Sequence, residues 1–318
     1  MALAVSVHAE INANGSAILF WTDDIGIFSA TRRLSRDGDP TQPALDTHLT
    51  DKGASMVFDP QLTLSNSFVN SLGTLQLNLM GQGYIFSEDP RFNQGMFRLQ
   101  AVQSFSRDTR LRLRYSLVPD QFLGENEDHR LDQSGLADER LSSHIWSVRM
   151  ERAITEQLEV KLLGRYGLRR YNEAFAQRDT NFFTVGPHLD WRISPGVMLG
   201  LGYHYERGLA DGRTKPELED DVSYVNHYVT AELDIELIDR LSLLMAAHYE
   251  RNNWTSGIPG DERNGGHENI VQGEMILVRQ LSEHVRVFGG VQRSSRKESF
   301  DTNSVKNTNI GIGLSGSF

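Results

Sequence analysis

Apolar and polar side chains alternate along most of this chain, and this two-residue period constrains the fold more than any other feature. In the clearest segment, Leu158 to Tyr171, residues Val160, Leu162 and Tyr166 alternate with charged residues. Successive side chains of a β-strand point to opposite faces, so such a segment has one apolar face and one charged face. From Gly53 onward the pattern recurs in segments of about ten residues, the length of a tilted strand that crosses a bilayer. The sequence therefore predicts membrane-crossing strands.

The pattern predicts about fourteen such strands. An irregular first strand is expected near Ala17 to Phe28. The alternation of the other strands begins near Met56, Leu75, Phe97, Leu111, Trp146, Leu158, Phe183, Val197, Val229, Leu241, Val271, Val285 and Thr308.

The connections between these strands alternate in length. The short connections are Asn70–Gly73, Arg107–Thr109, Thr155–Gln157, Ser194–Gly196, Ile238–Arg240 and Ser282–His284. The long, polar ones are Ala30–Asp51, Pro119–Leu141, Asn172–Asp179, Leu209–Asp221, Asn253–Gly266 and Arg296–Asn303. Tight turns at one rim and long loops at the other predict an all-β, antiparallel up-and-down transmembrane barrel. A soluble two-sheet sandwich also alternates, but it requires neither this order of hairpins nor charges along the whole opposite face.

Composition excludes several other classes of protein. The 318 residues are 39% hydrophobic and 23% charged, and the mean hydropathy is −0.41, so a bundle of transmembrane helices is hard to sustain. The chain has no cysteine, which removes thiolate chemistry, disulfides and cysteine-ligated zinc. A net charge of −10 disfavours nucleic acid as a partner.

The first nine residues, Met1 to Ala9, are mostly apolar and end in the small-x-small pattern Val7-His8-Ala9. This pattern precedes a signal-peptidase cut, so we interpret residues 1–9 as a signal-peptide remnant and residues 10–318 as one barrel domain. The alternative is an apolar first strand, because the usual positive start of a signal peptide is missing.

The last strand, Thr308 to Phe318, alternates apolar or small residues with polar ones and has a phenylalanine at its end. It resembles the C-terminal strand of bacterial outer-membrane β-barrel proteins, including porins, which the barrel-assembly machinery recognises. The resemblance implies an outer-membrane location, short turns in the periplasm, contact with outer-membrane lipids and lipopolysaccharide, and an assembly signal at Phe318. The segment Trp21-Thr22-Asp23-Asp24 departs from the pattern and leaves the first strand's register open.

No candidate catalytic or cofactor motif is complete. Gly311, Gly313 and Gly316 form a G-x-G-x-x-G at the chain end, where no helix follows, so they are expected to be packing glycines rather than a nucleotide site. The segment His144–Ser147 has the wrong spacing for barrel hydrolases, in which His and Ser lie two residues apart. His188, His204 and His248 fall on predicted inward faces. We expect no enzyme activity, metal or cofactor.

Charges on the predicted inward faces separate along the sequence. The basic residues come from the first half: Arg98, Arg110, Arg112, Arg114, Arg149, Lys161, Arg165 and Arg169. The acidic residues come from the second half: Glu206, Glu232, Asp234, Glu236, Glu250 and Glu274. In a closed barrel they form two facing walls, which either cancel as salt bridges in a filled interior or line an aqueous pore.

The sequence therefore predicts a channel for passive or selective passage of small polar solutes. The alternatives are an export pore for a polysaccharide and a plugged structural or adhesion barrel. The acidic residues of two predicted loops are interpreted as solvated surface, with bridging by divalent cations to lipopolysaccharide phosphates as a second possibility. These acidic residues are Glu125, Glu127, Asp128, Asp132, Asp138, Glu139, Glu217, Glu219, Asp220 and Asp221.

Overall fold

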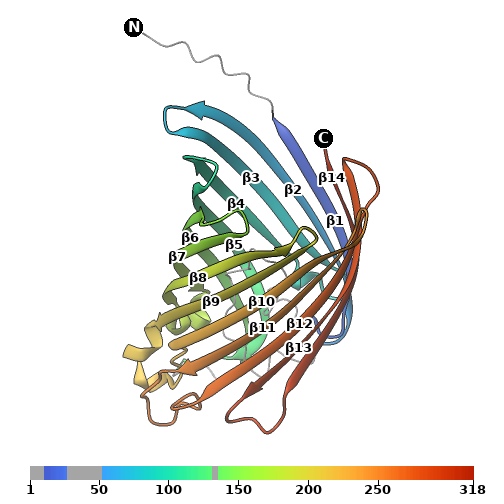
Figure 1. Cartoon of the computed structure of the whole chain (residues 1–318). Helices are drawn as coiled ribbons and strands as arrows, with labels where there is room; N and C mark the ends of the chain where they lie inside the picture. Colours follow the sequence, from blue (N-terminus) through green and yellow to red (C-terminus); the bar gives the residue numbers. More distant parts are fainter. Residues whose placement is uncertain (1–10, 27–51, 131–134) are drawn as a thin grey trace.

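Fourteen antiparallel strands close into a barrel in the computed structural model, which describes residues 11–26, 52–130 and 135–318 (Figure 1). Each strand pairs with its neighbours in the chain, and β14 pairs with β1. The strands are β1 Asn12–Thr22, β2 Ser55–Asn70, β3 Gly73–Phe86, β4 Gln94–Ser104, β5 Thr109–Glu127, β6 Leu136–Ala153, β7 Leu158–Tyr171, β8 Thr180–Ser194, β9 Val197–Ala210, β10 Tyr224–Ile238, β11 Leu241–Trp254, β12 His267–Gln280, β13 Val285–Glu298 and β14 Val305–Ser317. The predicted fold class and strand number are confirmed.

Short turns and longer loops lie at opposite rims, as the sequence predicts. The first strand begins and the last strand ends at the turn rim (Figure 1). The loop rim carries four 3₁₀ turns: η2 Pro90–Phe92, η3 Glu173–Arg178, η4 Asp211–Thr214 and η5 Pro216–Leu218. Over the described residues, none of the helices has the length and apolar character needed to cross a membrane.

The first strand differs from its predicted position near Ala17 to Phe28. It occupies Asn12–Thr22 and ends within the Trp-Thr-Asp-Asp segment, because Asp24 turns the chain. One Asp24 carboxylate oxygen accepts hydrogen bonds from the backbone N–H groups of Gly26 (3.0 Å) and Lys52 (3.2 Å). The predicted signal-peptide remnant, Met1 to Ala9, lies outside the described residues.

The predicted loop Pro119–Leu141 is mostly strand. The β5 strand continues to Glu127 and β6 begins at Leu136, with register shifts between Val118 and Gln121 and between Phe122 and Gly124. A β-bulge interrupts the alternation of faces, which hides a strand from a period-two search. Phe122 and Leu123 are both buried although they are adjacent, so this extension packs on both of its faces.

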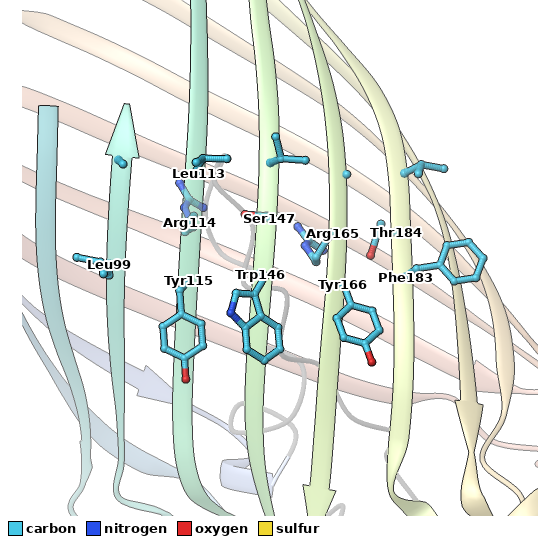
Figure 2. Close-up of a pocket in the computed structure, with 14 residues that line it drawn as sticks. Leu99, Leu113, Arg114, Tyr115, Trp146, Ser147, Arg165, Tyr166, Phe183 and Thr184 are labelled. Atoms are coloured by element: carbon cyan, nitrogen blue, oxygen red, sulfur yellow. The ribbon is translucent and has the colours of Figure 1, made fainter. Parts of the chain in front are cut away.

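The outer face of the barrel is apolar. Leu113 on β5, Leu162 on β7 and Ile312 on β14 are 50%, 60% and 61% exposed. Aromatic side chains lie side by side on neighbouring strands: the ring centroids of Tyr115 and Trp146 are 5.4 Å apart, and those of Trp146 and Tyr166 are 6.2 Å apart (Figure 2). Exposed aliphatic residues bordered by aromatic rings form the lipid-facing belt of membrane barrels.

Candidate functional site: the inner face of the barrel

The register of the sheet decides which side chains share a face. Residues that pair directly across strands point to the same side, so Arg110 opposite Glu151, Glu151 opposite Lys161 and Lys161 opposite His188 belong to one face. The opposite face carries the exposed apolar side chains, and it is therefore the outer one. By this register, all fourteen charged residues that the sequence predicts for the lumen belong to the inner face: Arg98, Arg110, Arg112, Arg114, Arg149, Lys161, Arg165, Arg169, Glu206, Glu232, Asp234, Glu236, Glu250 and Glu274.

The basic side chains of β5 and β7 lie among carboxylates. Arg110 contacts Glu151 (Nε to Oε2, 3.1 Å) and Glu159 (Nη2 to Oε2, 2.7 Å). The other Glu151 oxygen lies 3.0 Å from Arg112 Nη2. The Lys161 ammonium lies 2.5 Å from Asp190 Oδ2. The basic wall therefore contains ion pairs, although cations outnumber carboxylates in it.

Three more predicted lining residues of this wall, Arg98, Arg114 and Arg149, have neutral side chains among their neighbours. Arg114 donates from Nε and Nη2 to the Gln100 side-chain oxygen, at 3.1 and 2.9 Å. Arg98 lies with Nη1 at 3.9 Å from the Met80 sulfur. Arg149 is buried on β6, opposite Leu163 of β7.

Glu206 is part of the basic wall rather than the acidic one. Its carboxylate accepts hydrogen bonds from Thr184 (2.5 Å) and Tyr224 (2.6 Å). Arg169 donates to the Tyr224 hydroxyl at 2.8 Å, and its guanidinium also lies 3.8 Å from Glu206. Arg165 approaches the same carboxylate at 3.9 Å. Glu206 therefore marks the seam at which the two walls meet.

Two of the predicted inward histidines contact each other. His188 Nε2 and His204 Nε2 are 2.6 Å apart, His204 stacks on Tyr228, and the Tyr228 hydroxyl lies 2.6 Å from His248 Nδ1. Gly202 leaves room for this row, because a Cβ at that position would be 2.7 Å from a His188 ring nitrogen. The described ranges contain no group of three or more side chains that could hold a metal ion.

The inner faces of β10 to β12 are mainly acidic. They carry Glu232, Asp234, Glu236, Glu250 and Glu274, and also Glu268, which the sequence analysis did not select. Glu268 pairs with Arg296 of β13 and accepts a hydrogen bond from Asn252 at 2.8 Å. The side of the barrel opposite the arginine-rich strands therefore bears a net excess of carboxylates.

Buried charges join the loops at the loop rim. The Arg178 guanidinium lies 3.1 Å from Glu139 Oε1 and 2.7 Å from Asp220 Oδ2, and the exposed fractions of these three side chains are 2%, 0% and 0%. Arg263 approaches Asp220 from the β11–β12 loop at 3.4 Å. The interpretation of Glu139 and Asp220 as solvated surface is therefore wrong. They balance buried arginines that lie far away in the sequence, which a local charge count cannot detect.

These features define the class of protein. A closed fourteen-stranded antiparallel barrel with an apolar outer belt, a charged inner face and turns and loops at opposite rims is the outer-membrane β-barrel fold. No family model and no curated protein matches the chain.

Solved structures with this fold cover nearly the whole chain. The outer membrane channel DcaP of Acinetobacter baumannii is similar with a TM-score of 0.56 at 8% identity, over 98% of both chains. An anion-selective porin from Comamonas acidovorans is similar with a TM-score of 0.50 at 7% identity, over 98% of this chain and 99% of that one. A bacterial polysaccharide outer membrane secretin is similar with a TM-score of 0.50 at 10% identity, over 96% and 98%. At such low identities the likeness establishes the fold alone.

Proposed function

We propose that this protein is an outer-membrane channel through which small polar solutes diffuse across a water-filled lumen. The separation of charge on the inner face carries this proposal: cations concentrate on β4 to β7 and carboxylates on β10 to β12. Several of these side chains keep solvent contact: Arg110, Arg112 and Lys161 are 40%, 22% and 19% exposed. Charged side chains are tolerated in contact with water but are costly in a dry interior.

The size of the barrel supports the same function. Eight strands enclose an interior that side chains can fill, and the enclosed diameter grows with strand number. Two of the solved structures that share the fold are described as an outer membrane channel and an anion-selective porin. We propose the same class of activity here and leave the solute open.

We propose that no reaction is catalysed. His144 and Ser147 lie on opposite faces of β6, because their separation is odd. His144 Nδ1 instead lies 2.8 Å from the Tyr115 hydroxyl on the outer face.

The test is the ion selectivity of single channels in planar bilayers. In the variant E232Q/D234N/E236Q the acidic wall loses three charges, and the reversal potential in a KCl gradient should shift toward anions. The matched control E217Q/D239N/E283Q removes the same charge from a loop and two turns. If both variants shift the potential equally, or if the purified barrel does not conduct, the proposal is wrong.

A polysaccharide export pore is the second candidate, because one structure with the same fold is described as a polysaccharide outer membrane secretin. Long acidic or neutral oligosaccharides added to one side of the bilayer distinguish the two. An export pore should show long-lived, length-dependent blockage of the current, whereas a diffusion channel for small solutes should not.

A further inference from the structure

The outward face of β9 to β14 carries an uneven set of charges near the loop rim. All residues of these strands are described, and none of their outward side chains is Asp or Glu. Arg207, Arg251, Arg293, Lys297 and Lys306 are the outward cations of the loop-side halves of these strands. A set of exposed charges of one sign creates a positive potential that attracts anions.

Three of these cations form a compact group on β13 and β14, which we call the outer basic patch: Arg293, Lys297 and Lys306. Ser295 pairs with Lys306, so Lys306 is the diagonal neighbour of both Arg293 and Lys297. Diagonal neighbours lie about 7–8 Å apart, within reach of long side chains. All three side chains are exposed, and none forms a hydrogen bond or ion pair with any described residue.

The patch begins where the apolar belt ends. Arg293 pairs with Thr308, and the next outward pair toward the turn rim is Val291 and Ile310, which are exposed and apolar. A lipid whose chains lie on Val291 and Ile310 would therefore place its headgroup among the cations, with the Ser295 and Thr308 hydroxyls beside it.

Near the loop rim, the outward arginines of β6 and β7, Arg140 and Arg170, lie beside carboxylates. Arg140 pairs with Asp120 at 3.0 Å and Asp138 at 3.6 Å, and Arg170 lies 3.9 Å from Asp179. Carboxylates of the same chain neutralise those cations. Among the described residues, no carboxylate pairs with the outer basic patch.

We propose that the outer basic patch binds the phosphate groups of an anionic, phosphorylated glycolipid of the leaflet at the loop rim, whose acyl chains cover the apolar face below it. Phosphate suits this group because guanidinium and ammonium groups form charge-assisted hydrogen bonds with its oxygens. This contact is direct and involves strands, so it differs from cation bridging by acidic loops. It is also independent of conduction through the lumen, so a non-conducting barrel leaves it intact.

The test measures binding of fluorescent bisphosphorylated lipid A to the purified full-length barrel in neutral detergent micelles. The variant R293Q/K297Q/K306Q should bind roughly 100-fold more weakly, because each basic residue near an anionic headgroup contributes about fivefold. The matched control R107Q/R152Q/R279Q removes the same charge at the turn rim and should bind as the unchanged protein does. The conservative variant K297R/K306R should also retain binding.

Two further ligands distinguish the source of the phosphate. The patch variant and the control variant should bind lipid A that lacks both phosphates with equal affinity. The soluble bisphosphorylated disaccharide without acyl chains should bind far more weakly than the lipid, and inorganic phosphate should not compete at millimolar concentration.

The proposal is overturned if both glutamine variants bind lipid A equally, or if the patch variant loses as much affinity for the stripped lipid as for the phosphorylated one. It is also overturned if the soluble disaccharide binds as tightly as the lipid, or if the patch variant alone changes the oligomeric state. The last result would assign the cations to a subunit contact. Heat-modifiable migration on gels checks that each variant is folded.

Discussion

The two rims of this barrel are stabilised in different ways. At the turn rim, backbone hydrogen bonds close each hairpin, as between the Ile154 N–H and the Leu158 carbonyl (2.8 Å), and the turn residues are exposed. At the loop rim, buried charges on Arg178, Glu139 and Asp220 connect segments from β6, η3 and the β9–β10 loop. Short turns satisfy their own polar groups, whereas long loops depend on partners far away in the sequence. The turn rim should therefore tolerate substitutions that the loop rim does not.

The largest expected difference between the rims is accessibility. Peptide tags inserted after Glu217 or Glu262 should be labelled on intact cells, whereas tags at Thr155 or Gly196 should be labelled only after permeabilisation, because loops face outward and turns face the periplasm. Gly212 in the same loop is a poorer insertion site than Glu217, because a Cβ at Gly212 would lie 2.2 Å from the Asp220 carbonyl oxygen. Equal labelling of both pairs would contradict this orientation.

The next effect is on stability at the loop rim. The substitution Arg178→Met removes the shared cation and leaves buried carboxylates, which should lower the free energy of unfolding by about 3–5 kcal/mol. The matched change Arg240→Met, at an exposed turn, should stay within about 0.5 kcal/mol. Urea unfolding in lipid vesicles measures both. Equal midpoints for the two variants would mean that the buried network does not stabilise the rim.

Between the rims, the cost of a charge on the outer face should depend on depth. The substitution Leu113→Arg places a guanidinium in the apolar belt and should cost about 2–4 kcal/mol if that position lies near the midplane, whereas Leu72→Arg at the turn rim should cost about 0–1 kcal/mol. The same unfolding assay compares them. If the fold were soluble, the free-energy cost of Leu113→Arg would not depend on the thickness of the surrounding bilayer.

Phe318 at the turn rim should affect assembly more than stability. Its side chain is 86% exposed, and its backbone N–H donates to the Ala13 carbonyl at 2.8 Å. Given the resemblance of the last strand to the one that the assembly machinery recognises, Phe318→Ser should reduce the folded, heat-modifiable fraction in cells, whereas Phe105→Ser should not. The urea midpoint of the protein that does fold should be unchanged. An unaffected yield would remove the assembly role.

The smallest effect concerns the exposed β3–β4 loop. Hydrogen bonds from Arg91 lower the pKa of Asp89 below its ordinary value of 3.8. The stabilisation that the Asp89–Arg91 pair contributes is complete above the pKa that Asp89 has in the unfolded chain. It is lost as the pH falls through the lower pKa that Asp89 has in the folded protein. The loop should therefore be unaffected between pH 7 and 5 and loosen only below about pH 4. Limited proteolysis of the unchanged protein and of Asp89→Asn across this range is the measurement, and cleavage that increases already at pH 6 would contradict it.

The regular strands could be predicted from sequence, and the irregular ones could not. In β7 the register has no bulge and most residues alternate, with Leu163 as an apolar residue on the inner face, so one segment defines both faces. In β5 the bulges near Asp120, which has a φ of 45°, shift the pattern and conceal the last third of the strand. Alternation also placed the predicted lumen residues on one face, but it could not show which of them form ion pairs.

Pairing follows from register, which the sequence fixes only near short turns. The pairing of Arg110 with Glu151 could be predicted by counting residues along both strands from the β5–β6 hairpin, but only if the positions of the bulges were known. The contacts of Arg178 with Glu139 and Asp220 join residues 39 and 42 positions apart. No local pattern specifies such contacts.

The barrel is closed only when β14 pairs with β1, so an incomplete chain cannot form it. The Asn307 amide donates to the Thr22 hydroxyl across 285 positions of sequence, and every other strand already has both neighbours before that contact forms. Until the last residues are available, two strand edges expose unpaired backbone groups, which in a bilayer no water can satisfy. The closing contacts cannot form until the last strand has been synthesised, since they have nearly the largest sequence separation the chain allows. The time between synthesis and closure is therefore when the chain is most prone to aggregate, and a truncation of a dozen residues at its end should be as damaging as the loss of a whole half.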